Sequence, residues 1–285
     1  MPDRKEIDSV VQRALDEEMP DITSEAIFEK SDRGTAAFVM KASGILAGLD
    51  FAEATFRSLE RDAVFTRRAG DGDSVKPGHV VAEVSASVIV LLSGERTALN
   101  FMQRASGIAT ATRRYVDAVR GTNAKIYDTR KTVPGLRILD KHAVHAGGGE
   151  NHRYGLHDMF LIKNNHIDRA GSIRAAVERV RARGGSRQIM VEVRDERELD
   201  DALALSPDFI MLDNMSPERM RAAVEKTAGR IPLEASGGIT LDNVRQVAET
   251  GVDRISVGAI THSVIALDIS MRIGSSKLSA RGRTA

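Results

Sequence analysis

The sequence contains no cysteine and no tryptophan, and aromatic residues make up only 4% of it. Without cysteine there can be no disulfide, no thiolate metal site and no cysteine nucleophile. So few aromatics argue against a surface on which nucleobases stack. Residues 1–19 are highly charged and lack the apolar core of a signal peptide, and no run approaches the ~20 apolar residues of a membrane span. These absences predict a cytoplasmic protein that does not enter a membrane.

The charge of the chain is nearly balanced, with 41 basic and 40 acidic side chains. A balanced chain has no overall field that would attract nucleic acid or an anionic membrane, so neither is expected as a partner. The length of 285 residues suits one or two domains with a substantial core.

The hydrophobic pattern divides the chain into two parts. The first third mixes helix and strand: Ile7, Val10, Val11 and Leu15 recur at helical spacing, and residues 35–43 are typical of a strand. The remainder alternates short β-branched runs with amphipathic helices such as 172–183, 217–227 and 240–249. This alternation predicts an α/β fold with a parallel sheet, and the number of repeats favours a closed barrel over an open doubly wound sheet. The apolar runs are residues 124–128, 159–163, 189–193, 209–212, 233–235 and 255–257.

Polar side chains follow four of these runs, at the edge where barrel enzymes place their reactive groups. Asp128 precedes Thr129-Arg130-Lys131, Lys163 ends the second run, and Asp213 follows the fourth. A single polar residue at a strand end is more often a helix cap or a solvated group, but four in succession favour a site. Glu192 is the sharpest signal, because a carboxylate inside an apolar strand needs a cation partner: a metal ion, Lys or Arg.

Glycines follow the last two strands, in Ser236-Gly237-Gly238 and in Val257-Gly258-Ala259. Glycine lets backbone N–H groups approach an anion, and a phosphate site at the last two strands recurs among barrels. Either segment alone could be an ordinary turn, whereas together they favour phosphate binding.

Five of the seven histidines lie between His142 and His166. A zinc site would have to use histidine and carboxylates alone, and no HExxH motif is present. We expect instead that His142 and His145 lie on a helix that begins at Pro134 and ends at 147–149. His152 and Arg153 would then join Arg130, Lys131 and Lys163 in a cationic pocket suited to a small polyanion. The alternative is that these are scattered surface charges.

Eight segments together resemble the quinolinate phosphoribosyltransferase family, in family order and over nearly the whole chain. They are residues 96–100 (RTALN), 106–110 (SGIAT), 128–135 (DTRKTVPG), 147–153 (GGGENHR), 161–163 (LIK), 212–214 (LDN), 234–238 (EASGG) and 261–263 (THS). The resemblance implies an N-terminal α/β sandwich domain, 1–105, joined by 266–285, and an irregular (β/α) TIM-like barrel over 106–265. It also implies a homodimer, or a higher assembly, whose active sites take an arginine from the partner subunit, and Arg96 matches that arginine.

The implied reaction joins quinolinate to phosphoribosyl pyrophosphate (PRPP) with Mg2+ and no organic cofactor, giving nicotinate mononucleotide, pyrophosphate and CO2. By this resemblance Arg130, His152, Arg153, Lys163 and Arg96 hold the substrate carboxylates. Lys131 meets PRPP and acts in catalysis with Glu192 and Asp213, which bind the ribose hydroxyls directly or through Mg2+. Thr129 is a further substrate-binding residue. The residues that bind the 5′-phosphate by this resemblance are Ser236, Gly237, Gly238, Val257, Gly258, Ala259 and His262.

Two segments depart from the family pattern. Residues 17–23 (EEMPDIT) are shortened and lack a glycine, and Asn164 stands where Asp is common after the lysine. A paralogue that ribosylates another aromatic carboxylate and a non-catalytic phosphoribosyl sensor are therefore the alternatives. A Schiff-base aldolase using Lys163 is a third, and it lacks an obvious second lysine.

Overall fold

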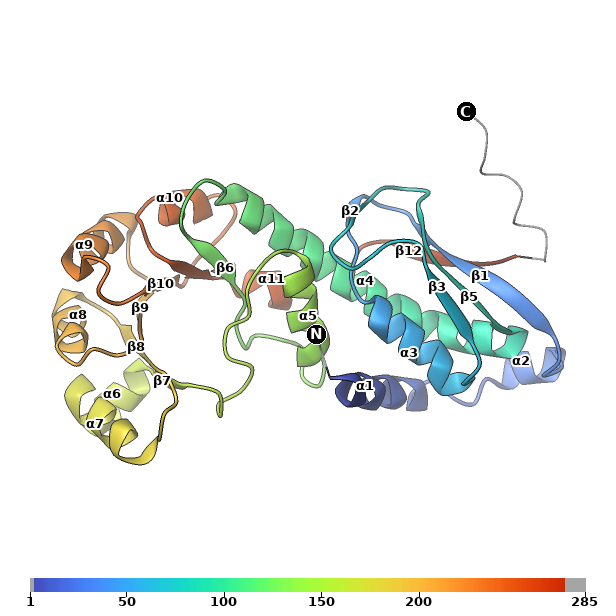
Figure 1. The fold of residues 1–285 in the computed structure, drawn as a ribbon, viewed down its shortest axis with the longest axis horizontal. Helices are drawn as coiled ribbons and strands as arrows, with labels where there is room; N and C mark the ends of the chain where they lie inside the picture. Colours follow the sequence, from blue (N-terminus) through green and yellow to red (C-terminus); the bar gives the residue numbers. More distant parts are fainter. Residues whose placement is uncertain (1–2, 275–285) are drawn as a thin grey trace. The chain divides into compact units, whose positions relative to one another are not determined.

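The structure is a computed structural model that describes residues 3–274 and divides them into two compact units (Figure 1). Residues 3–111, 133–148 and 264–274 form the first unit. Residues 112–132 and 149–263 form the second. The first unit mixes helices with an antiparallel sheet, and the second has the parallel sheet with helices that the sequence predicts.

The first unit is built on a four-stranded antiparallel sheet of order β12-β1-β5-β3. Its core buries Phe38, Phe56 and Met102 completely, between this sheet and helices α3 and α4. β12 pairs with β1, and residues 264–274 group with this unit, whereas 275–285 of the expected C-terminal segment lie outside the described residues. The elements are α1 (Arg4–Asp16), α2 (Ile22–Ile27), β1 (Arg33–Met40), β2 (Gly44–Ile45), α3 (Leu49–Leu59), β3 (Val64–Arg67), β4 (Ser74–Val75), β5 (Val80–Ser87), α4 (Val88–Ala118) and β12 (Ile269–Gly274).

Helix α5 (Arg137–Ala146) differs from expectation in both its unit and its start. Gly135 adopts φ +81°, a turn conformation, so the helix begins at Arg137 and not at Pro134. It belongs to the first unit, whereas the expected boundary placed it in the barrel. Its wholly buried Asp140 receives two hydrogen bonds from the Arg104 guanidinium, at 2.8 and 2.7 Å. His142 Nε2 lies 2.7 Å from an Asp71 carboxylate oxygen.

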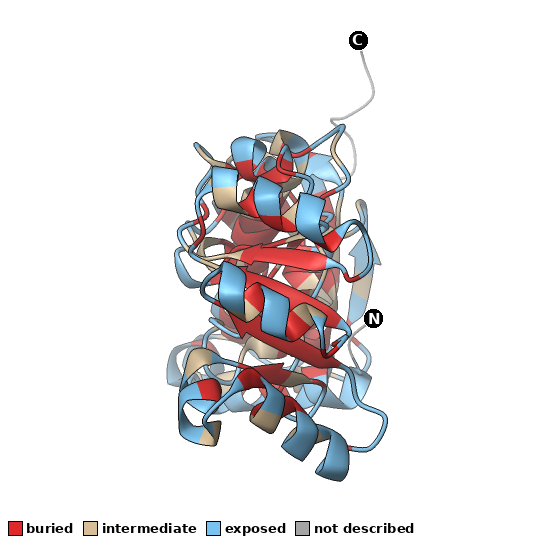
Figure 2. Cartoon of the chain, turned by 90° about the vertical axis from the view of Figure 1, so that its left-hand side faces the viewer, coloured by how far each residue is buried: buried red, intermediate tan, exposed pale blue. Residues whose placement is uncertain are grey.

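The second unit is a six-stranded sheet of order β6-β11-β10-β9-β8-β7, with parallel neighbours throughout. All six predicted apolar runs supply a strand. Figure 2 shows these strands buried and the covering helices exposed on their outer side. The strands are β6 (Lys125–Tyr127), β7 (Phe160–Ile162), β8 (Ile189–Val193), β9 (Phe209–Asp213), β10 (Leu233–Ser236) and β11 (Arg254–Ser256), and the helices are α6 (Asn164–Ala170), α7 (Ile173–Arg183), α8 (Glu196–Leu203), α9 (Pro217–Thr227), α10 (Val244–Ala248) and α11 (Ala259–His262).

Within the described residues β6 and β7 are the two edges of this sheet, so the closed barrel expected from the repeat count is open. The reason is that the chain between β6 and β7 contributes its helix, α5, to the first unit. Two consecutive parallel strands are normally neighbours when the helix that connects them packs on the sheet. The helix between β6 and β7 belongs to the first unit, and these two strands are not neighbours. A second correction concerns 240–249, where only α10 is helical and the preceding residues form a turn.

Strand alternation determines which side chains share one face of the parallel sheet. Register pairs Glu192 with Met211, Met211 with Glu234, and Glu234 with Arg254. Successive side chains point to opposite faces, so Asp213, Ser236 and Ser256 lie on this same face, two residues further along their strands. The centre of this face therefore carries the charged side chains of Glu192, Glu234 and Arg254 around the apolar Met211. The carboxyl ends of the strands carry polar side chains.

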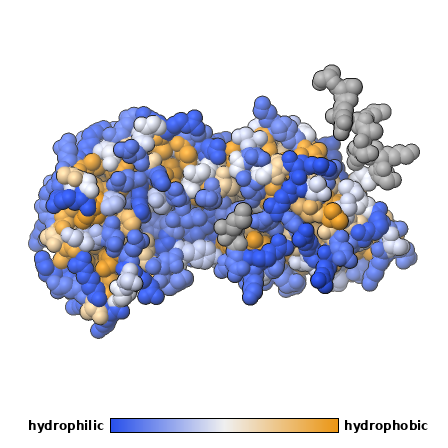
Figure 3. Space-filling model, viewed as in Figure 1, coloured by the Kyte–Doolittle hydropathy of each residue, from blue (hydrophilic) through white to orange (hydrophobic). Residues whose placement is uncertain are grey.

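No helix in residues 3–274 combines the length and apolar composition that crossing a membrane requires. On the face shown in Figure 3 hydrophilic residues predominate, and hydrophobic ones form separate patches. Scattered exposed apolar residues are normal on a protein surface.

Candidate active site

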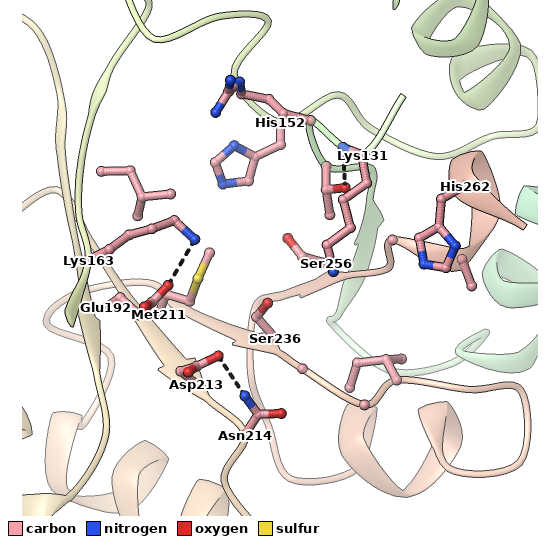
Figure 4. Close-up of a pocket in the computed structure, with 18 of the residues that line it drawn as sticks. Lys131, His152, Lys163, Glu192, Met211, Asp213, Asn214, Ser236, Ser256 and His262 are labelled. Carbon is pink, nitrogen blue, oxygen red and sulfur yellow. Dashed lines mark hydrogen bonds and ion pairs between the residues drawn. The ribbon is translucent and has the colours of Figure 1, made fainter. Parts of the chain in front are cut away.

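A cavity of about 700 Å³ lies at the carboxyl ends of the strands in the second unit (Figure 4). Every expected site residue of this unit lines it except Val257, which is wholly buried beneath. The lining residues are Thr129, Arg130, Lys131, His152, Arg153, Leu161, Lys163, Glu192, Met211, Asp213, Asn214, Ser236, Gly237, Gly238, Ile239, Thr240, Ser256, Gly258, Ala259 and His262.

One end of the cavity gathers positive charge from Arg130, Arg153 and Lys163. Burial lowers the pKa of the Arg153 guanidinium, and the positive charge of Arg130 lowers it further, while Asp158 raises it in part. Arginine remains charged at neutral pH even so. Because the Arg153 guanidinium is partly buried and close to the positive charge of Arg130, an anion that binds beside both would stabilise them.

Lys163 and Glu192 point toward each other across this end, with Nζ 3.2 Å from Oε2 (Figure 4). The Glu192 side chain is 8% exposed and that of Lys163 is 50% exposed. The sequence prediction that this strand carboxylate would have a cation partner is confirmed, and the partner is a lysine.

Removing either member of this pair should have unequal effects on stability. Lys163→Met leaves a nearly buried carboxylate without its cation, so we expect the free energy of unfolding to fall by about 1–3 kcal/mol. Glu192→Gln leaves an ammonium that water already solvates, so a loss below about 1 kcal/mol is expected. Urea denaturation of the two variants measures the difference. Equal losses would contradict the buried carboxylate as the cause.

Asp213 and Asn214 form a second pair, at the end of β9. Asn214 has a left-handed backbone (φ +53°), and its Nδ2 donates to Asp213 Oδ1 at 3.0 Å. Its amide also lies against Gly237, where a Cβ would be 2.2 Å from Asn214 Oδ1. Asn214 therefore connects the carboxylate of Asp213 with the glycine segment after β10.

Two neighbouring glycines offer a matched test of this close approach. Gly237 and Gly238 both have positive φ (+94° and +62°), but a Cβ at Gly238 would meet nothing within 4 Å. Gly237→Ala should displace Asn214 and raise the KM for PRPP, the substrate that the family resemblance implies, by about tenfold or more. Gly238→Ala carries only the backbone strain, so a smaller rise is expected. Steady-state kinetics compares them, and equal KM values for the two variants would exclude the contact with Asn214 as the cause.

The opposite end of the cavity is formed by Gly258, α11 and Lys131. Thr261 Oγ1 donates to the Lys131 carbonyl oxygen at 3.0 Å, which ties α11 to the segment after β6. A Cβ at Gly258 would lie 2.9 Å from Lys131 Cδ and 3.2 Å from the His262 ring. The glycine thus makes room for the lysine stem.

Sequence reasoning missed Glu234, which is wholly buried on β10, as a separate candidate. Its Oε1 accepts a hydrogen bond from Ser256 Oγ, and His152 Nε2 lies 3.4 Å from the same oxygen. The signal was available, because Glu234 is an acid inside an apolar strand, as Glu192 is. Ser256 carried no such signal, since serine is common at strand ends.

Arg96 lies in the first unit, exposed on α4. It borders a cavity of about 350 Å³ formed with the shortened segment, residues 18–23. Within that segment Asp21 caps α2 and accepts a hydrogen bond from Ser93 Oγ at 3.0 Å. Hydrogen bonds from Ser24, and then from Ser93, lower the pKa of the Asp21 carboxyl. The segment without its glycine is therefore fixed to α4 one helical turn before Arg96.

The second departure, Asn164, is the first residue of α6 and is half-buried. Its Oδ1 is buried and has no hydrogen-bond partner among the described residues. An aspartate there would place part of its charge on an unpaired buried oxygen. Neutral asparagine suits this position better.

The histidines do not form one cluster. His142 pairs with Asp71 in the first unit, whereas His152 lines the cavity of the second. Within residues 3–274 no group of three or more His, Cys, Asp or Glu side chains is arranged to hold a metal ion. The zinc alternative gains no support from this arrangement.

Comparison with known proteins agrees with this geometry. The family model for the quinolinate phosphoribosyl transferase C-terminal domain matches residues 108–272, and that for the N-terminal domain matches 21–106. The chain is 45% identical over 254 residues to a probable nicotinate-nucleotide pyrophosphorylase [carboxylating] of Bacillus subtilis, covering 89% of this chain and 88% of the relative. It is 43% identical over 274 residues to the Mycobacterium leprae nicotinate-nucleotide pyrophosphorylase [carboxylating], covering 92% and 95%.

A solved structure of the nicotinate-nucleotide pyrophosphorylase from Francisella tularensis superposes with a TM-score of 0.92 at 37% identity, covering 96% of this chain and 98% of that one. Both domain models, the curated relatives and the fold agree over nearly the whole sequence. The chain belongs to the quinolinate phosphoribosyltransferase family.

Proposed function

We propose that this protein transfers the phosphoribosyl group of PRPP to quinolinate and releases pyrophosphate and CO2, forming nicotinate mononucleotide for NAD biosynthesis. The observation that carries the proposal is that one cavity is lined by a group of cations, by two strand carboxylates and by two glycine segments. A dicarboxylic acid, a ribose and a phosphate need these three kinds of group.

The acid is held at the cationic end. Arg130, Arg153 and Lys163 supply charge-assisted hydrogen bonds to its two carboxylates, and His152 lies beside them. The Arg153 backbone N–H donates to His152 Nδ1 at 2.7 Å, so the ring N–H is on Nε2. The partner subunit's Arg96 would complete this end in a homodimer, which accounts for an exposed arginine outside the barrel.

The ribose lies between Glu192 and Asp213. Carboxylate oxygens accept hydrogen bonds from ribose hydroxyls, and they are also the ligands that Mg2+ prefers. Two carboxylates suit Mg2+ that keeps waters and substrate phosphates as its other ligands. Bound there, the ion would supply positive charge that stabilises the departing pyrophosphate.

The 5′-phosphate is held by the backbone of Ser236–Gly238 and Gly258–Ala259, with His262 beside it. Thr129 and Lys131, which also line the cavity, would meet the pyrophosphate of PRPP. Thr129 Oγ1 accepts the Lys131 backbone N–H at 3.0 Å and so shapes the turn that carries the lysine.

Residues of the cavity would assist the transfer of the phosphoribosyl group, and the charge on the product ring would drive the loss of CO2. As the bond from ribose C1 to pyrophosphate breaks, positive charge develops on the ribose, and the carboxylates of Glu192 and Asp213 stabilise it. Lys131 offsets the negative charge on the leaving pyrophosphate. The ring nitrogen of quinolinate then bonds to C1, which makes the ring cationic. That ring accepts the electron pair left when the 2-carboxylate departs as CO2, and C2 takes up a proton.

The test is the product formed by purified protein, Mg2+, PRPP and quinolinate, with nicotinate in a parallel reaction. With quinolinate that carries an isotopic label in its 2-carboxylate, we expect nicotinate mononucleotide and labelled CO2. With nicotinate we expect no product. Product from nicotinate alone would make the protein a paralogue for another acid. PRPP binding without turnover of either acid would make it a phosphoribosyl sensor.

A further inference from the structure

We propose that Glu234 is a positioning residue, which fixes the tautomer and orientation of His152 and through it the backbone at Arg153. This rests on the proposed function for its kinetic consequence, but the contact between Glu234 and His152 is independent of the substrate. Glu234 does not line the cavity, and no step derived above uses it.

Glu234 lies on β10, a central strand of the sheet, and its exposure is 0%. Burying a carboxylate costs several kcal/mol unless polar groups surround it. Ser256 Oγ donates to Oε1, but Oε2 is buried without a hydrogen-bond partner among the described residues. One hydroxyl is a poor replacement for water around this group, so its burial calls for another partner.

The His152 ring lies beside this carboxyl group, with Nε2 3.4 Å from Oε1, the oxygen that also accepts from Ser256 Oγ. The His152 side chain is itself only 7% exposed. A backbone N–H can only donate, so the hydrogen bond from Arg153 N to Nδ1 requires Nδ1 without a proton. The ring proton is then on Nε2, the nitrogen that lies 3.4 Å from the carboxyl oxygen Oε1. Glu234 and the Arg153 amide thus select the same tautomer from opposite sides of the ring.

The main chain at His152 is fixed as well. Its N–H donates to Oδ1 of Asp128 at 2.8 Å, and Asp128 is wholly buried. The ring and the backbone of His152 are therefore held by two buried acids from β10 and the end of β6. The residue held in this way is followed directly by Arg153, whose guanidinium reaches the cavity.

The consequence for binding follows from this chain of contacts. If the His152 ring turned or changed tautomer, Nδ1 would stop accepting from Arg153 N, and the peptide that carries the guanidinium would be released. Glu234 would then act on the acid end through His152, whereas a general disturbance of β10 would also reach the phosphate segment 236–238, which follows Glu234 on the same strand, and would raise the KM for PRPP. A merely structural role would not separate the two substrates in this way.

The experiment combines histidine NMR with kinetics on the full chain. In protein carrying 15N-labelled histidine, the His152 signal is assigned by its loss in His152→Gln. We expect wild-type His152 to show the Nε2–H tautomer, Glu234→Gln to alter that signal, and Glu234→Asp to restore it in part. Glu234→Gln should also raise the KM for quinolinate by about tenfold, the loss of one charge-assisted hydrogen bond, with the KM for PRPP changed less than about threefold.

The matched control is Glu150→Gln, which neutralises an exposed carboxylate of the same unit paired with Lys125. It should leave both the His152 signal and the two KM values unchanged. The proposal is overturned if wild-type His152 carries its proton on Nδ1, or if Glu234→Gln leaves its signal unchanged. Because the wild-type spectrum needs no variant and no turnover, it tests the contact even if Glu234→Gln does not fold or quinolinate is not the substrate.

Discussion

Glu192→Gln is expected to lower kcat by about 10²–10³-fold, the loss seen when one preorganised electrostatic group is removed from a developing charge. Glutamine keeps the shape of the side chain and removes only its negative charge. The KM for quinolinate should change little, because the loss concerns the positive charge that develops on the ribose. Single-turnover measurements with saturating PRPP and quinolinate report this step directly.

Two further variants sharpen the result. Glu192→Asp keeps the charge but withdraws it by one methylene, so an intermediate loss of about tenfold is expected. Glu150→Gln changes an exposed carboxylate of the same unit and should leave kcat unaffected. A Glu192→Gln enzyme with kcat within about threefold of wild type would show that this carboxylate only binds substrate.

The sequence alone indicates which strand residues share one face of the sheet, because strand alternation and burial act on each residue locally. An acid in an apolar strand, such as Glu192, needs a polar or charged partner. Because side chains alternate along a strand, Glu192 lies on the same face of the sheet as Asp213. The same reasoning applies to Glu234, whose partner Ser256 comes from another strand 22 residues away. Only the register between β10 and β11 shows that these two side chains meet.

The domain boundary and the open sheet could not be predicted, because they depend on contacts between distant residues. Helix α5 is amphipathic, as a barrel helix would be. Its assignment to the first unit rests on Asp140 with Arg104 and on His142 with Asp71, pairs separated by 36 and 71 residues. Periodicity carries no information about such pairs. Once α5 is assigned elsewhere, the absence of a crossover between β6 and β7 follows.

The acid end provides the second large expected effect. Arg153→Met should lower kcat/KM for quinolinate by about 10³-fold, since a guanidinium that pairs with a carboxylate through two charged hydrogen bonds contributes about 3–5 kcal/mol. Arg153→Lys keeps the charge but loses the two-pronged geometry, so a loss of about 10²-fold is expected. The affinity for PRPP, measured by calorimetry, should change little in both variants.

Arg153 also donates to the Met159 carbonyl oxygen at 3.1 Å, so its removal could act by loosening the loop before β7. Arg187 separates the two effects, because it donates to the His157 carbonyl oxygen of the same loop at 3.0 Å but does not line the cavity. If Arg153 acts on the acid, Arg187→Met leaves kcat/KM for quinolinate nearly unchanged. Benzene-1,2-dicarboxylate, which has adjacent carboxylates but no ring nitrogen to react, should then bind more weakly to Arg153→Met by the same factor as quinolinate. Equal losses in the Arg187 and Arg153 variants would instead assign the effect to the loop, and the positive charge of Arg130 and Lys163 would then suffice to hold the acid.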